Sequence, residues 1–316
     1  MRLSGLPGWL IAGAQLPVAP ATVAAVPMTG RSDAEVISLE GYGQFSGTVI
    51  NSTYTGYELP KLVDAWLGID YAVQPVGPEG RFQPIRGWPA PFEGVRAAAE
   101  YGRTCVQMPT TAVPVETQDE ACLNFNVYRP QGASATSSST SGDKNSKKLL
   151  PVLVWIHGGS FNAGSWKSFD GAAFAAASAE PILVVTFHYR VNSLGFLPSA
   201  LFEEEGLLNL GVRDQHFFLK EFLQKHVAAF GGDPENITLG GRSAGGHSVG
   251  IHYFHNYGED EDTAQQPPYF ARAIHQSGSV TARTFPNATY PLYAEHFATF
   301  MDHIGCPTDV DNAAAL

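Results

Sequence analysis

Residues 236–254 read NITLGGRSAGGHSVGIHYF and join two patterns in one short stretch. The first five residues are rich in β-formers and predict a strand, whereas residues 246–254 are compatible with a helix. Between them lies the pentapeptide Gly241-Arg242-Ser243-Ala244-Gly245, a G-x-S-x-G motif. In a strand–turn–helix context this motif forms a nucleophile elbow. Because the chain holds 33 glycines, an ordinary Gly/Ser turn is the alternative interpretation.

Such an elbow holds its serine in a strained backbone conformation and exposes the hydroxyl at the N-terminus of the helix. Glycines are needed at Gly241 and Gly245, because a β-carbon at either position would collide with the neighbouring strand and helix. We therefore expect the Oγ of Ser243 to be presented as a nucleophile.

A second motif lies upstream, where LLPVLVWI at residues 149–156 predicts a buried strand. It is followed directly by His157-Gly158-Gly159-Ser160-Phe161, and a glycine-rich loop in this place can aim backbone N–H groups into a pocket. Acyl transfer needs such donors, because negative charge develops on the carbonyl oxygen as the tetrahedral intermediate forms. Each motif follows its own strand, which favours this interpretation over a pair of unrelated glycine turns.

The sequence here resembles the type B carboxylesterases, with the cholinesterases and related lipases, all of the α/β-hydrolase fold. The matching segments besides the elbow are Trp66–Ala72, Gly77–Phe82, Asp119–Tyr128, Trp155–Gly164, Asn209–Gln215, Phe230–Pro234 and Ala273–Gly278. The resemblance implies an α/β fold with a central, mostly parallel sheet flanked by helices. It also implies a carboxylic ester hydrolase acting on small-molecule or lipid esters, with no cofactor and no metal ion.

Carried over position by position, the resemblance makes Ser243 the nucleophile and the N–H groups of Gly159, Ser160 and Ala244 the oxyanion hole. Ser160 stands where the family usually has a third glycine. If that position requires a positive φ, the serine costs about 1–2 kcal/mol. Arg242 replaces the glutamate usual beside the nucleophile, and the loop between Cys105 and Cys122 lacks the tryptophan that binds quaternary ammonium in cholinesterases. Choline esters are therefore poor candidates as substrates.

The resemblance also pairs Cys105 with Cys122 in a disulfide, against the alternative of buried free thiols. Cys306 is then left without a partner. Two buried ion pairs are implied in the same way, Arg81 with Glu120 and Arg190 with Asp214. Three N-x-S/T sequons that fit a secretory route are candidate glycosylation sites, at Asn51, Asn236 and Asn287.

Composition and charge are those of a single globular domain. The chain has 316 residues, 44% of them hydrophobic, and a net charge of −11 without clustered Lys and Arg, so nucleic acid is an unexpected partner. Residues 1–25 predict a secretory signal peptide, against a disordered Ala/Pro arm, and no other stretch is long and apolar enough to cross a bilayer. We assign residues 26–316 to one α/β-hydrolase domain, with a flexible Ser-rich loop at 132–148.

The acid and the histidine of a catalytic triad are the parts we do not find. In this fold they follow the serine, in the order Ser, Asp or Glu, His, on loops after later strands. After Ser243 only residues 272–276 predict a strand; residues 259–262 (EDED) form a charged loop, and His296 and His303 lie in a predicted helix. We expect an N-terminal part of a larger domain, ending after its elbow half. The alternatives are a non-catalytic, cholinesterase-like adhesion protein and an inactive truncated product.

Overall fold

The computed structural model describes residues 34–133, 149–255, 269–279, 281 and 287–307. All of them belong to one compact unit, Ser32–Leu316. The predicted signal peptide, most of the Ser-rich loop and the acidic residues 259–262 lie outside the described residues.

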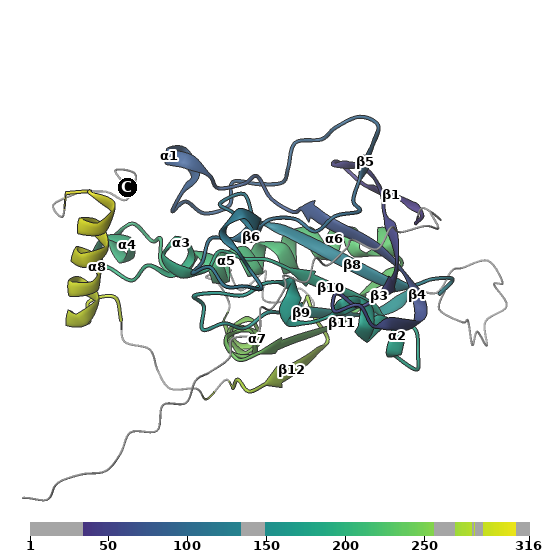
Figure 1. The fold of residues 1–316 in the computed structure, drawn as a ribbon. Coiled ribbons are helices and arrows are strands. Elements are labelled where there is room, and N and C mark those ends of the chain that lie inside the picture. The colour runs from purple at the N-terminus through teal and green to yellow at the C-terminus, as the bar shows by residue number, and fades with distance from the viewer. Residues whose placement is uncertain (1–33, 134–148, 256–268, 280, 282–286, 308–316) are drawn as a thin grey trace, which may run out of the picture. The chain divides into compact units, whose positions relative to one another are not determined.

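A seven-stranded sheet organises this unit, in the order β12-β11-β9-β10-β8-β4-β3 (Figure 1). Its strands are β3 (Thr48–Ser52), β4 (Glu58–Asp70), β8 (Asn124–Pro130), β9 (Leu150–Ile156), β10 (Leu183–Phe187), β11 (Gly232–Arg242) and β12 (Arg272–Gln276). The pairings β12-β11, β11-β9 and β9-β10 are parallel, and those from β10 through β8 and β4 to β3 are antiparallel. The α/β-hydrolase prediction is thus confirmed, and the parallel part of the mixed sheet is the part that carries both glycine motifs.

Two smaller sheets and the helices complete the described fold. One sheet joins β1 (Val36–Leu39), β2 (Gly43–Ser46) and β5 (Val95–Ala97), and the other pairs β6 (Thr104–Cys105) with β7 (Gln118–Asp119). The α-helices are α1 (Gly77–Gly80), α2 (Gly171–Ala177), α3 (Asn192–Phe196), α4 (Ala200–Glu204), α5 (Leu210–His216), α6 (Gln224–His226), α7 (Ala244–Phe254) and α8 (Pro291–Ile304). Short helical segments occur at η1 (Val115–Thr117), η2 (Trp166–Ser168), η3 (Phe217–Leu223) and η4 (Val227–Phe230).

Both faces of the central strand β9 are buried, which explains why it is apolar along nearly its whole length. Side chains alternate across a strand, so Val152 and Val154 belong to one core cluster and Leu153 to another. The first cluster is completed by aromatic residues of η3, among them Phe218 and Phe222, and the second by the alanines of α2. The sheet is therefore held between layers of helix and has little freedom to shift.

Residues 210–226 form one continuous helix whose middle part is π-helical. The π segment η3 lies between α5 and α6 and buries Phe218, Leu219, Phe222 and Leu223. The wider π turn brings this set of large side chains onto the sheet, and sequence periodicity does not distinguish it from an α-helix.

Register determines where the site forms. Gly241 of β11 is paired with Ile156 of β9 on one side and with His275 of β12 on the other. Because parallel strands end at the same edge of a sheet, the loop after β9 and the turn after β11 emerge next to each other.

Candidate active site at the ends of β9 and β11

Ser243 links β11 to α7 in a conformation that few residues adopt. Its backbone has φ 55° and ψ −121°. The Ser243 N–H donates to Gln276 O at 2.7 Å and its carbonyl accepts from the N–H of His247 at 3.0 Å. Both neighbouring elements therefore hold the strained residue in place, as expected where strain is part of a functional site.

Space around the elbow is too small for side chains at the two flanking glycines. A β-carbon on Gly241 would lie 2.3 Å from the carbonyl oxygen of Gly245 in α7. One on Gly245 would lie 2.1 Å from the carbonyl oxygen of Ile156 in β9. The sharp turn is possible only because these residues have no side chain, so the helix starts directly against the strand.

The glycine-rich loop after β9 packs against this elbow. A β-carbon on Gly158 would lie 2.4 Å from the carbonyl oxygen of Arg242 and 3.1 Å from the β-carbon of Ser243. The carbonyl of Gly159 accepts hydrogen bonds from the N–H groups of Asn162 and Ala163, both at 3.0 Å. The loop thus folds back on itself at the position where it touches the serine.

Ser160, which stands where the family usually has a glycine, has a positive φ. Three consecutive residues of the loop have positive φ: Gly159 at 119°, Ser160 at 57° and Phe161 at 61°. An L-residue in this region is strained, at a cost of about 1–2 kcal/mol.

Replacing Ser160 by glycine should raise the free energy of unfolding. Relief of the strain exceeds the loss of about 0.5–1 kcal/mol expected from the greater freedom of glycine in the unfolded chain. Urea denaturation should show a small net gain for Ser160→Gly. Ser38→Gly in β1, at a residue outside the positive-φ set, should lower stability instead. Equal effects of the two substitutions would contradict a strained Ser160.

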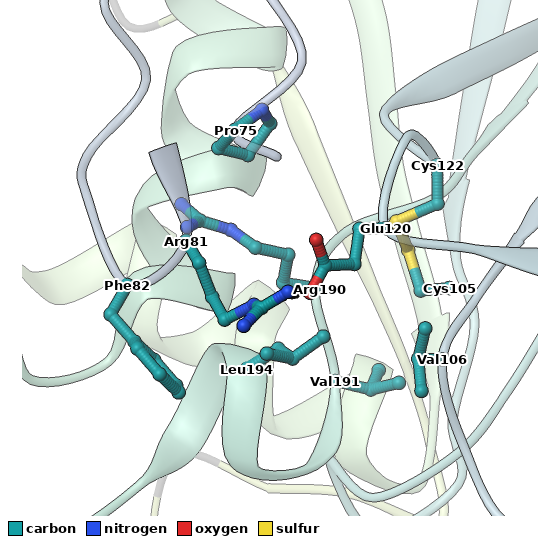
Figure 2. Close-up of a pocket in the computed structure, with 10 residues that line it drawn as sticks. All are labelled: Pro75, Arg81, Phe82, Cys105, Val106, Glu120, Cys122, Arg190, Val191 and Leu194. Atoms are coloured by element: carbon teal, nitrogen blue, oxygen red, sulfur yellow. Dashed lines mark hydrogen bonds and ion pairs between the residues drawn. A yellow bond between two sulfur atoms is a disulfide. The ribbon is translucent and has the colours of Figure 1, made fainter. Parts of the chain in front are cut away.

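The predicted disulfide is confirmed. Cys105 and Cys122 are bonded, with Cα atoms 4.9 Å apart, and Cys306 is free. Beside the disulfide lies a small pocket that is also lined by Arg81, Glu120 and Arg190 (Figure 2).

Removing this disulfide should lower the free energy of unfolding by about 3 kcal/mol, because it closes a 17-residue interval in the unfolded chain. Urea denaturation of the double variant Cys105→Ser/Cys122→Ser measures the loss. Cys306→Ser, at a partly exposed thiol, should change stability by less than about 0.5 kcal/mol. Thiol titration of the denatured, unreduced protein should find one free thiol, and three would refute the disulfide.

Of the two predicted ion pairs, one is buried and one is not. Arg190 Nη2 lies 2.6 Å from Asp214 Oδ1, and the two side chains are 4% and 0% exposed. Arg81 Nε lies 2.5 Å from Glu120 Oε1, but these side chains are 37% and 23% exposed. The prediction of burial was wrong for the second pair because α1, which leads to Arg81, is a short helix without buried residues.

The histidines near the site have structural contacts. Burial lowers the pKa of His157 to about 4 and that of His188 to about 3, so both rings are neutral at pH 7. The ring of His157 stacks on Tyr189 with centroids 4.3 Å apart, and the Tyr189 hydroxyl donates to His157 O at 2.8 Å. These contacts fix the start of the glycine-rich loop.

Within the described residues, the Ser243 hydroxyl forms no hydrogen bond with a histidine or a carboxylate. The ring of His247 interacts with the backbone of Ser279, and Nδ1 of His275 lies 2.9 Å from Gly246 O. In α8 the ring of His303 bonds to Thr299 O of its own helix at 2.7 Å, and His296 is exposed.

The three sequon asparagines lie at or near the surface. Asn51 in β3 and Asn287 before α8 are exposed, and Asn236 in β11 is half-buried, with its Oδ1 accepting from Arg272 at 2.6 Å. The part of the chain that the structure describes contains no helix with the length and apolar character needed to cross a membrane. Nor does that part bring together three or more His, Cys, Asp or Glu side chains suited to a metal ion.

Sequence comparison matches residues 33–315 to the model of the carboxylesterase family. The chain belongs to this family. It is 58% identical over 294 residues to Secreted lipase 4 of Gibberella zeae, covering 93% of this chain and 49% of that protein. It is 38% identical over 214 residues to the para-nitrobenzyl esterase of Bacillus subtilis, covering 66% of this chain and 38% of that protein.

Solved structures of esterases agree with this assignment. A structure titled thermophylic pNB esterase superposes with a TM-score of 0.68 at 31% identity, covering 89% of this carboxylesterase family member and 51% of that chain. A second pNB esterase gives a TM-score of 0.65 at 33% identity. The chain spans about half the length of the relatives it matches.

Proposed function

We propose that this carboxylesterase family member is a secreted carboxylic ester hydrolase in which Ser243 forms the acyl-enzyme. The observation that carries the proposal is the conformation of Ser243, at φ 55° and ψ −121°, with the Gly158–Gly159 loop packed against its β-carbon. A chain that only presented a surface to a partner would have no use for a strained serine at this position. The extracellular location rests on the signal-like residues 1–25 and on the similarity to a secreted lipase.

The proposed reaction has two steps. Ser243 Oγ attacks the ester carbonyl carbon while a general base takes its proton, and the alcohol leaves with a proton returned from that base. Water then attacks the acyl-enzyme and releases the carboxylic acid. In both steps the N–H groups of Gly159, Ser160 and Ala244 stabilise the negative charge on the carbonyl oxygen.

We assign the general base and its acid partner to no residue of this chain. The described histidines near Ser243 bond elsewhere, and the acidic residues 259–262 lie outside the described residues. Without a base the serine hydroxyl stays neutral, so the elbow and the oxyanion loop give only a residual acceleration of about 10³–10⁴ over water.

Comparison of two proteins tests the proposal. One is residues 1–316 alone, and the other is this chain joined to the part of the Gibberella zeae lipase that the match leaves uncovered. Nitrophenyl butyrate should be turned over at an enzymatic rate by the joined protein only. Equal turnover by the short chain, lost on His296→Ala or His303→Ala, would show that a local histidine is the base. Absence of turnover in both, with both folded, would favour the adhesion-type alternative.

A further inference from the structure

Gln107 connects the disulfide segment to the glycine-rich loop. This residue lies two positions after Cys105, and its side chain is buried. Its amide nitrogen donates to Gly164 O at 2.9 Å, and its amide oxygen accepts from Gly164 N at 2.9 Å. The same nitrogen donates to Cys105 O at 3.0 Å. One side chain therefore satisfies both backbone groups of Gly164 and ties them to a residue of the disulfide.

Gly164 contacts His157 and Gly158, and Gly158 lies beside Ser243. It has φ +141°, and a β-carbon there would lie 2.0 Å from His157 Nδ1 and 2.4 Å from Gly158 O. Gly164 thus packs directly on the start of the loop, and Gly158 packs on Ser243. A continuous series of contacts runs from Gln107 through Gly164 and Gly158 to the elbow.

The disulfide segment is itself fixed at this point. The N–H of Gln107 donates to Gln118 Oε1 at 2.8 Å, and Gln118 Nε2 donates to Val113 O at 3.1 Å. Because Cys105 and Cys122 are bonded, Gln107 is anchored on a closed segment rather than on a free loop. A buried amide with all its groups paired holds its partner in one orientation.

We infer that Gln107 is a positioning residue for ester hydrolysis, which holds the N–H donors of the oxyanion loop in place from the Cys105–Cys122 segment. The inference rests on the proposed function of Ser243. Gln107 does not reach the reacting atoms, and it acts through the backbone of Gly164. Small displacements of a catalytic group, of about 1 Å, cost up to 10²-fold in rate.

A matched control exists in the same chain. Gln74 makes the same three types of bond: its amide pairs with the N–H and C=O of Leu123 and donates to Ala72 O two residues before it. Its partner Leu123 is next to Cys122 and not in the oxyanion loop. Gln107→Met and Gln74→Met therefore remove equivalent hydrogen bonds, of which only the first set holds the loop.

The test compares both variants in the joined protein, which is this chain extended by the uncovered part of the Gibberella zeae lipase. Nitrophenyl butyrate is the substrate, and a trifluoromethyl ketone is the inhibitor that forms an oxyanion on Ser243. Gln107→Met should lower kcat about 10- to 100-fold and leave KM within twofold of the unsubstituted protein. It should also lower the affinity for the ketone by a factor similar to the loss of kcat. Gln74→Met should leave kcat and ketone affinity within about twofold, even where its loss of stability in urea is equal.

An unchanged kcat in Gln107→Met, or an equal loss of kcat in Gln107→Met and Gln74→Met, would overturn the inference. If Gln107→Met does not fold, the isosteric Gln107→Glu replaces it, because its carboxylate still accepts from Gly164 N but cannot donate to Gly164 O. Wild-type kcat and ketone affinity in folded Gln107→Glu would likewise overturn the inference. Absence of turnover in the unsubstituted joined protein, or full turnover in its Ser243→Ala variant, would instead refute the proposed function.

Discussion

Replacing Ser243 by alanine is expected to abolish acyl-enzyme formation and to lower turnover of an activated ester by about 10⁴–10⁶ in the joined protein, which is this chain extended by the uncovered part of the Gibberella zeae lipase. The elbow places this hydroxyl at the start of α7 and next to Gly158. Alanine leaves the backbone of the turn unchanged and removes only the attacking atom. What remains is stabilisation of the oxyanion without a nucleophile, which gives a residual acceleration of about 10³–10⁴ over water.

Covalent labelling measures the same loss without the need for turnover. A fluorophosphonate reacts with an activated serine hydroxyl, so the joined protein should be labelled and its Ser243→Ala variant should not. Ser248→Ala is the matched control, because Ser248 is a buried serine in the same helix whose hydroxyl has no partner among the described residues. Loss of that unpaired hydroxyl should leave labelling intact. Persistent labelling of Ser243→Ala would identify a different nucleophile.

The elbow and the strands around it are the part of the fold that the sequence predicts well. A continuous apolar run such as residues 150–156 is a strong signal because both faces of β9 are covered by helices. The turn is equally readable, because collisions at Gly241 and Gly245 leave only glycine at those positions. The strand and the turn each depend on a few neighbouring residues, so a short stretch of sequence is enough to predict them.

The antiparallel half of the sheet and the supports of the site were not predicted. β8 pairs with β10 and with β4 over long separations, which no local periodicity encodes. Gln107 bonds to Gly164 across 57 positions and belongs to no recurring pattern of residues. The strain at Ser160 could be predicted only for the case that its φ is positive. The sequence shows that a serine replaces a glycine, but the value of φ comes from the structure.

The two ion pairs show that resemblance to a family predicts which residues are in contact better than it predicts how buried they are. Both pairs formed, but Arg81 and Glu120, which line the pocket in Figure 2, remain partly exposed. Arg190 and Asp214 are enclosed. Burial depends on the elements packed around a pair, and these are not specified by the two residues themselves.

Replacing Asp214 by alanine is expected to lower the free energy of unfolding by about 3–5 kcal/mol, the largest loss that any single substitution discussed for this chain should cause. Asp214 accepts three hydrogen bonds from Arg190: from the backbone N–H at 3.1 Å, from Nε at 2.8 Å and from Nη2 at 2.6 Å. Burial opposes the charged form of Arg190, but the attraction of Asp214 raises the pKa of the guanidinium. Without Asp214 a buried positive charge stays without its counter-ion.

Urea denaturation of three variants separates this cause from general disruption. Glu120→Ala breaks the partly exposed pair with Arg81 and should cost no more than about 1 kcal/mol. The double variant Arg190→Met/Asp214→Leu removes both charges and should be more stable than Asp214→Ala, because the penalty comes from the uncompensated charge and not from the loss of the pair. If Asp214→Ala and Glu120→Ala were equally mild, Arg190 would have to reach solvent, and the enclosed Arg190–Asp214 pair would not exist as described.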